Sequence, residues 1–109
     1  MIPVRYGIYL AALDPTVGRE IAKTRPVVVV SMDAMNRHAE NVVVCPLTTK
    51  LQPTWRSRIQ VRSAGKSAEI AVDQIRTIST LRLVKKGDVL AAADASRLRE
   101  LIVEMYGLP

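Results

Sequence analysis

The sequence is poor in the side chains from which many metal and catalytic sites are built. It holds one cysteine, Cys45, and one histidine, His38, among 109 residues. A single cysteine excludes a disulfide within the chain, and the two residues together cannot supply the ligands of a zinc site. We therefore expect neither a metal ion nor another cofactor. A lone histidine also argues against a ribonuclease mechanism that divides acid and base work between two histidines.

Long apolar runs are missing as well. The longest uninterrupted ones cover residues 8–13 and 26–30, whereas a helix that crosses a bilayer needs about 20 apolar residues. The first seven residues lack the basic segment and long apolar stretch of a secretory signal. We expect a cytoplasmic, soluble protein that does not contact membranes. Its length predicts one domain, covering residues 1–109.

Acidic side chains are outnumbered, with 10 Asp and Glu against 16 Lys and Arg, so that the net charge is +6. Residues 19–66 hold nine of the basic and three of the acidic side chains, and this difference of six equals the whole excess. A polyanionic partner would explain such a distribution. A basic surface that only aids solubility would explain it equally well, and charge alone does not separate the two.

Among the patterns that are present, β-branched runs dominate the first half. Residues 6–13 are apolar and predict a buried strand, followed by a proline-containing turn at residues 14–18. Residues 27–31 and 42–47 are rich in valine, too short for helices, and predict two central strands that pair. The polar residues 32–41 between them are expected to be irregular.

In the second half, residues 51–57 read as a loop, and residues 57–61 and 69–78 alternate between polar and apolar side chains, which is typical of half-buried strands. The alternation breaks between Val72 and Ile75, which indicates a bulge or a bend.

A terminal helix follows from a change of period after residue 87. One helical face is apolar, formed by Leu98, Leu101, Ile102 and Met105. We expect Asp94 to cap its start and Gly107 to end it with a left-handed conformation. Five or six short strands and one late helix predict an α+β fold that is mainly β, with a small, strongly curved sheet or barrel and a C-terminal helix packed on it.

Four separated blocks of sequence carry a family resemblance. They are LDPTVGRE (residues 13–20), KTRPVVVVS (23–31), VCPLTTK (44–50) and DQIRT (73–77). Their order and spacing resemble the MazF/PemK family, the endoribonuclease toxins of bacterial type II toxin–antitoxin pairs. The resemblance implies a barrel related to SH3 domains and to the toxin CcdB, a homodimer, ribosome-independent and sequence-specific cleavage of single-stranded RNA, and inhibition by a cognate antitoxin. The need to cover valine-rich strands in a small domain also favours a homodimer.

Some positions depart from the family pattern. Tyr6 and Gly7 stand where the family usually has Gly-Asp, and Ile21 and Lys23 replace the usual Gln and Gly of the following loop. The nucleotide sequence that is cut is therefore not carried over from the family.

Three residues match the family's catalytic positions, and their side chains suit the cleavage of RNA. RNA is cleaved without a metal when the ribose 2′-OH attacks its own phosphate, provided that charge and protons are managed. Arg25 matches the catalytic arginine, whose planar donors fit phosphate oxygens. Thr48 matches a threonine that donates to a phosphate oxygen, and Glu20 a loop glutamate that accepts the 2′-OH proton or orients Arg25. Without the resemblance they would read as an edge arginine, a turn threonine and a solvated carboxylate.

Further residues are predicted to bind RNA. Gln74 and Arg76 align with the family's RNA groove, although a strand-stabilising role fits them nearly as well. Trp55, beside Arg56, is suited to stack on a base, but with so few aromatic residues we slightly prefer it as a cap on the core. The rest of the predicted RNA-binding set is polar or basic: Arg19, Lys23, Thr49 and Lys50. Cys45 is expected to be an inert buried thiol and His38 to be solvated.

Two other functions are compatible with the same fold or with the same basic charge. A toxin of this architecture that binds a protein target without catalysis, as the gyrase poison CcdB does, would not need the pair Arg25 and Thr48. A catalytically silent RNA-binding module would use the basic surface but not the pair. For an inhibitor, the basic residues favour an antitoxin with an acidic, disordered segment.

Overall fold

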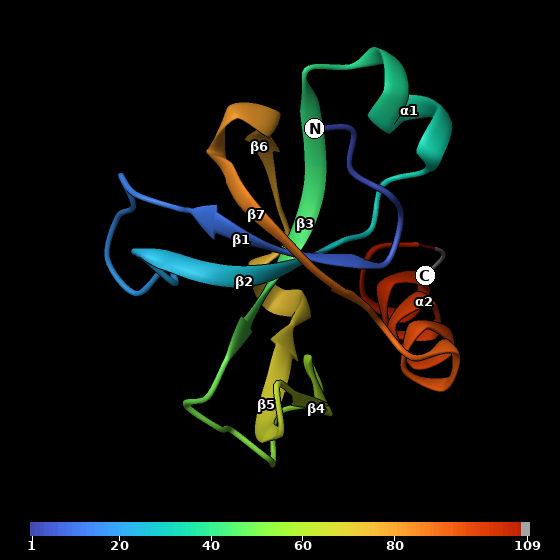
Figure 1. Ribbon diagram of the computed structural model, residues 1–109. Helices are drawn as coiled ribbons and strands as arrows, with labels where there is room; N and C mark the ends of the chain where they lie inside the picture. Colours follow the sequence, from blue (N-terminus) through green and yellow to red (C-terminus); the bar gives the residue numbers. More distant parts are fainter. Residues whose placement is uncertain (108–109) are drawn as a thin grey trace.

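The computed structural model describes residues 1–107 and shows a strongly bent antiparallel sheet with one long helix (Figure 1). The strands are β1 (Gly7–Ala12), β2 (Thr24–Val29), β3 (Asn41–Thr48), β4 (Arg58–Ser63), β5 (Lys66–Ala71), β6 (Arg76–Ser79) and β7 (Leu83–Val89). The helices are α1 (Asp33–His38) and α2 (Ala92–Tyr106), with single 3₁₀ turns η1 (Val72–Gln74) and η2 (Thr80–Arg82). The predicted fold class, mainly β with a C-terminal helix, is confirmed.

Strand β3 connects the two halves of the sheet. The strand order is β4-β5-β3-β2-β1-β7, and β6 also pairs with β3. Residues 41–44 of β3 pair with β6, whereas Leu47 and Thr48 at its other end pair with β5. The predicted pairing of the two valine strands is confirmed, because β2 and β3 are antiparallel neighbours with Val28 opposite Cys45.

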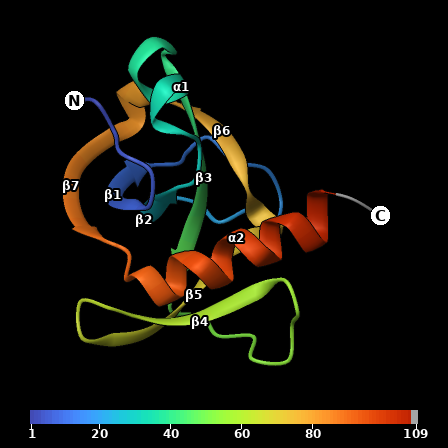
Figure 2. The same ribbon diagram turned by 90° about the vertical axis from the view of Figure 1, so that its right-hand side faces the viewer.

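The run of valines is uninterrupted because both faces of β2 are buried. Val27 and Val29 join one core with Tyr9, and Val28 joins a second core with Leu98 of α2. Figure 2 shows α2 lying across β3, β5 and β4 on the side of the second core. All three valines of β2 have no exposed surface. A single chain thus covers its own valine strands, so their cover does not favour a homodimer as the sequence argument expected.

The expectation that residues 32–41 are irregular is also wrong, because α1 lies within them. Apolar periodicity does not mark this helix, since it is held by polar contacts. The buried Asn36 accepts a hydrogen bond from the Ser31 hydroxyl at 2.5 Å and donates one to the Ser31 carbonyl at 2.9 Å. The Asp33 carboxylate accepts the Arg5 N–H at 2.8 Å.

The second half of the chain differs from prediction in two places. The strand at residues 57–61 exists as β4, but the single strand expected at residues 69–78 is two strands, β5 and β6, separated by η1. The break in alternation marks the point where the chain crosses from one half of the sheet to the other. Strand β7 was not predicted from the sequence. Only Leu83 of its residues is buried, so no apolar alternation marks the strand.

Helix α2 presents the predicted apolar face to the core, but its ends differ from prediction. Asp94 does not cap the helix, because it lies within the first turn and pairs with Arg97 at 2.8 Å. Gly107 ends the helix with a φ of −87°, so it is not left-handed. The first loop also turns later than expected, at Val17, whose carbonyl accepts the Glu20 N–H at 3.3 Å. Within residues 1–107, no helix is long and apolar enough to cross a membrane.

Candidate active site

The adjoining ends of β2 and β3 bring Arg25 and Thr48 to one hollow. Continuing the register of the pair, in which Val27 lies opposite Pro46, places Arg25 level with Thr48. Both line a hollow of about 160 Å³, together with Thr49 and Lys66. The Arg25 side chain is exposed. Arg25 lies near the start of β2, where Pro26 favours an extended backbone for the residue before it, as expected.

Both side chains keep donors that a phosphate can use. The Arg25 Nε donates to the Ala22 carbonyl at 3.3 Å, and this is the one bond of its guanidinium found within the described residues. The Thr48 hydroxyl accepts the Lys50 N–H at 3.1 Å. Because a hydroxyl that accepts through its oxygen still carries its own hydrogen, Thr48 is able to donate as well.

A second hollow lies along the loop that precedes β2. Its volume is about 480 Å³, and Arg19, Glu20, Gln74 and Arg76 line it. The Glu20 carboxylate accepts the Val17 N–H at 2.7 Å and so stabilises the turn of this loop. Within residues 1–107 it makes no ion pair with Arg25, and it lies outside the hollow of Arg25 and Thr48.

Gln74 and Arg76 hold this loop against the sheet. The Gln74 Oε1 accepts the Ile21 N–H at 2.6 Å, and its Nε2 donates to the Arg19 carbonyl at 3.4 Å. The Arg76 Nη1 donates to the Leu13 carbonyl at 3.3 Å. Gln74 lies in η1 rather than in a strand, so the loop, and not a strand, is what it stabilises.

A third hollow, of about 700 Å³, shares Arg19 and Gln74 with the loop hollow and shares Thr48 with the Arg25 hollow. The three hollows therefore adjoin one another through shared residues, and we call them together the groove. Lys50 and Trp55 line its far part. The groove thus combines basic side chains, an exposed aromatic ring and the paired donors of Arg25 and Thr48.

A family model described as "PemK-like, MazF-like toxin of type II toxin-antitoxin system" matches residues 4–106. The chain belongs to this family. It is 36% identical over 92 residues to "Endoribonuclease EndoA" of Bacillus subtilis (strain 168), an alignment that covers 79% of this chain and 78% of that protein. The prediction of a MazF-like endoribonuclease toxin is confirmed at this level.

Solved structures support the fold. "Crystal structure of MazF (Form-I) from Deinococcus radiodurans" superposes with a TM-score of 0.86 at 19% identity, covering 99% of each chain. "Endoribonuclease in complex with its cognate antitoxin from Mycobacterial species" superposes with a TM-score of 0.77 at 24% identity, covering 99% of this chain and 96% of that chain. At these identities the likeness concerns the fold.

Trp55 of this MazF-like toxin does not cap the core, contrary to our preferred interpretation. Its side chain is 47% exposed, and its ring centroid lies 4.7 Å from the guanidinium carbon of Arg58. Arg58 is itself almost buried and ion-paired, so it forms a polar floor under the ring where an apolar core was expected.

Two predicted RNA-binding residues lie apart from the groove of the toxin. Arg56 is exposed and pairs with Glu104 of α2. Lys23 lines none of the three hollows; it has a φ of +66°, and its carbonyl accepts the Leu13 N–H at 2.8 Å. It therefore closes the loop through its backbone, while its side chain is exposed.

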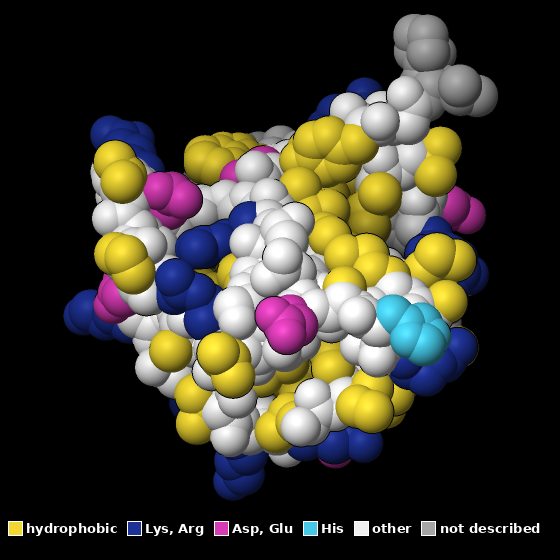
Figure 3. All heavy atoms as spheres, turned by 90° about the horizontal axis from the view of Figure 1, so that it is seen from above, with side chains coloured by type: hydrophobic (Ala, Val, Ile, Leu, Met, Phe, Trp, Pro, Cys, Tyr) yellow, Lys and Arg dark blue, Asp and Glu magenta, His cyan; other side chains and the backbone are white. Residues whose placement is uncertain are grey.

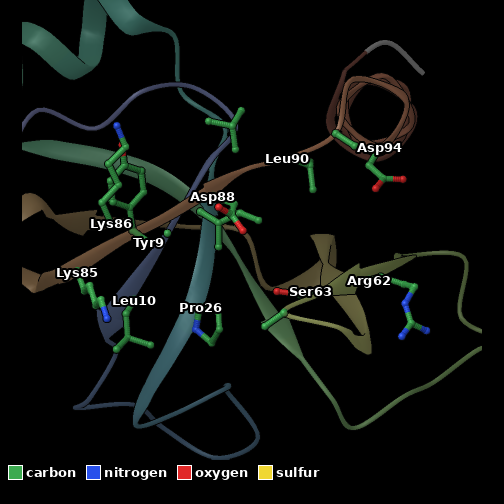
Figure 4. A pocket seen from close by; sticks show the side chains of 15 residues that line it. Tyr9, Leu10, Pro26, Arg62, Ser63, Lys85, Lys86, Asp88, Leu90 and Asp94 are labelled. Atoms are coloured by element: carbon green, nitrogen blue, oxygen red, sulfur yellow. The ribbon is translucent and has the colours of Figure 1, made fainter.

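Sequence analysis of the toxin missed several cationic residues. Lys66 shares the Arg25 hollow. A further hollow of about 420 Å³ lies between β7, the β4–β5 turn and the start of α2, and includes Arg62, Lys85 and Lys86 (Figure 4). It adjoins the Arg25 hollow through the shared Pro26. These lysines and this arginine lie in or beside turns and edge strands, where no periodic pattern marks them.

Two expectations about side chains outside the groove are confirmed. Cys45 is fully buried, and burial, with a smaller contribution from the charge of Asp73, raises its pKa from 9.0 to about 12. The thiol is thus kept in its inert protonated form. His38 is exposed on the surface, where it is the cyan side chain of Figure 3. Among the described residues, no three His, Cys, Asp or Glu side chains group as metal ligands.

Proposed function

We propose that this MazF-like toxin cleaves single-stranded RNA in the cytoplasm, at short sequences, independently of the ribosome and of metal ions. The observation that supports this best is the meeting of Arg25 and Thr48 in one hollow, at the end of a groove with basic and aromatic walls. A protein that only bound a partner would not need two phosphate donors in one hollow.

The proposed reaction uses the RNA's own nucleophile. The ribose 2′ oxygen forms a bond to the neighbouring phosphorus, and the bond from phosphorus to the 5′ oxygen breaks. The departing 5′ oxygen takes up a proton from water, so the products are a 2′,3′-cyclic phosphate and a 5′-OH. Charge accumulates on the non-bridging oxygens, where Arg25 and Thr48 donate hydrogen bonds. Glu20 is the candidate acceptor of the 2′-OH proton. Because it lies in the loop hollow, this role requires the loop to approach Arg25 when RNA binds.

The remaining predicted residues divide by the contacts they make. Arg19, Thr49, Lys50 and Trp55 face solvent and are proposed to contact RNA directly. Gln74 and Arg76 are proposed to shape the groove through the loop they hold, in keeping with their backbone bonds.

The test of the function is to incubate the purified protein with a long RNA in EDTA and to determine the ends of the products. We expect cleavage to persist without divalent cations and to leave 2′,3′-cyclic phosphate ends. The matched substrate carries a single 2′-deoxy sugar at the cut site and should remain intact. Equal cleavage of the two substrates would show that the 2′-OH is not the nucleophile.

We further propose a cognate antitoxin whose acidic, disordered segment lies in the groove. A mycobacterial endoribonuclease of the same fold was solved with its cognate antitoxin, and the basic groove of this chain suits carboxylates. We also propose a homodimer, on the family resemblance and on two exposed apolar side chains of the edge strand β7, Val84 and Val89. Sedimentation at micromolar concentration tests it, and a fully active monomer would contradict it.

A further inference from the structure

A carboxylate with no exposed surface lies beneath the groove. Glu69 of β5 is fully buried, and both of its oxygens are used. They accept the Gln52 N–H at 2.9 and 2.8 Å, the Gln60 amide at 2.5 Å and the Arg58 Nη1 at 3.1 Å. Burying a charge is costly, and apolar side chains often replace buried ion pairs without loss of stability. Stability alone is therefore a weak reason for a glutamate at this position.

Arg58 and its two carboxylate partners, Glu69 and Asp73, form a cluster that extends to the wall of the groove. The Arg58 side chain is 6% exposed and also binds Asp73 through Nε at 2.8 Å. Burial by itself lowers the pKa of Arg58, but the hydrogen bonds and charges of Asp73 and Glu69 outweigh it, so the pKa is raised above its usual value. Asp73 is an acidic residue in a basic groove, and Arg58 neutralises it. With its donors held by two carboxylates, Arg58 is not placed to bind a phosphate.

The cluster fixes an otherwise irregular loop, residues 49–57, at two points. At one point, Glu69 holds the Gln52 N–H. At the other, the Arg58 guanidinium carbon lies 4.7 Å from the centroid of the Trp55 ring. Between the two points the Trp55 N–H donates to the Gln52 carbonyl at 3.0 Å. The ring is therefore supported on one face, while Trp55 as a residue remains 47% exposed and lines the groove.

We infer that Glu69 and Arg58 are positioning residues: Glu69 fixes Arg58 and the loop, and Arg58 holds the Trp55 ring as a flat platform on which one base of the RNA stacks. The base as occupant rests on the proposed function, whereas the support of the ring does not. Stacking on an aromatic ring is tolerant of sequence and contributes to affinity. A platform held in place before RNA arrives gives up less conformational freedom when RNA binds.

The chain offers a direct test because Trp55 is its only tryptophan, so all indole fluorescence reports on this ring. In the free protein, Glu69→Gln should lower the emission anisotropy of Trp55 and increase its quenching by acrylamide. The reason is that a glutamine lacks the second acceptor oxygen and the charge that hold Gln52 and Arg58. Glu100→Gln, the same change on the exposed surface of α2, is the matched control and should leave both signals unchanged.

In cleavage assays, Glu69→Gln should raise KM for RNA about tenfold, the magnitude of one lost base stack. The kcat should stay within about twofold. Thr48 pairs with position 69 through the backbone, which the substitution keeps, and among the described residues neither Arg25 nor Thr48 makes a side-chain bond to Glu69. Arg58→Lys is the second variant, since it keeps the charge but lacks the planar fork and stacking surface. It should likewise raise KM and leave kcat nearly unchanged. Thermal unfolding confirms that each variant is folded.

The outcomes separate the inference from the proposed function. Unchanged anisotropy and quenching in both folded variants would overturn the support of the ring, whether or not RNA is cleaved. Altered fluorescence with unchanged KM would show that Trp55 is held but is not a platform for RNA. If the wild-type protein cleaves no RNA while the fluorescence changes occur as expected, the proposed function fails and the positioning of Trp55 stands.

Discussion

At the scale of the residue, Arg25 is expected to contribute to activity but not to the stability of the fold. It is exposed, and its one side-chain bond within the described residues is to the Ala22 carbonyl. We expect Arg25→Ala to abolish RNA cleavage while changing the free energy of unfolding by no more than about 0.5 kcal/mol, as for other surface substitutions. Product formation in EDTA and thermal unfolding measure the two effects.

Arg37→Ala is the matched control for Arg25, because Arg37 is exposed on α1, outside the groove. It should leave cleavage unchanged. A wild-type rate in Arg25→Ala would remove this arginine from the active site.

Cys45 predicts a dependence of stability on pH. Its pKa in the folded protein is about 12 against an ordinary 9.0. The folded state thus holds its proton more tightly, and the resulting stabilisation is fully present below pH 9.0 and is lost as the pH rises from there towards about 12. We expect denaturant unfolding to show a steeper loss of stability over this window in wild type than in Cys45→Ala. Equal pH slopes would refute the buried thiol as the cause.

Sequence reasoning found individual residues where a motif marks them and missed those defined by contacts. Arg25 and Thr48 were selected through the blocks RPVVVV and PLTT, and the structure brings them together. The support of Trp55 could not be predicted, because the contact of Arg58 with Glu69 depends on the register of the β4–β5 hairpin, which pairs Gln60 with Glu69. Hydrophobic alternation does not give that register.

At the scale of the element, the Gln74 amide is one of the contacts that hold the loop of residues 13–23, beside that of Arg76. Gln74 holds the loop through the Ile21 N–H and the Arg19 carbonyl. We expect Gln74→Ala to lower the free energy of unfolding by about 1 kcal/mol, the usual net contribution of such bonds. It should also raise KM for RNA, because Arg19 is no longer held in the groove.

Gln74→Glu is the informative companion to Gln74→Ala. It keeps an acceptor for the Ile21 N–H but loses the donor to Arg19, so its stability should fall between those of Gln74→Ala and wild type. An unchanged KM in both variants would show that the order of the loop is irrelevant to RNA binding.

Elements with a strong period were predictable, and those that depend on tertiary contacts were not. The face of α2 and the pairing of β2 with β3 followed from apolar spacing and β-branched runs. Helix α1 depends on the buried Asn36, and β7 lies at an edge with one buried residue. In neither case does the pattern of apolar residues carry the information.

At the scale of the whole molecule, RNA and antitoxin should compete. The groove that attracts phosphates should also attract carboxylates, and a disordered segment needs both charge pairing and apolar contacts to offset its ordering. We expect the acidic fragment of the cognate antitoxin to displace labelled, uncleavable RNA, and to bind more weakly as salt rises. RNA that stays bound at a saturating concentration of fragment would contradict a shared groove.

Some arginines of this surface bond to backbone carbonyls, and this affects how strongly RNA binding depends on salt. Arg76 and Arg82 keep their charge but donate to the carbonyls of Leu13 and Ala12, so the formal charge overstates the number of cations placed to contact an RNA phosphate directly. Among the described residues, the charged groups of Arg19, Lys50 and Lys66 line the groove with no hydrogen-bond or ion-pair partner, and Arg25 uses only its Nε, so that both of its terminal nitrogens remain available. Four phosphate contacts release a correspondingly small number of counterions, so the logarithm of RNA affinity should fall with the logarithm of salt at a slope of about −3.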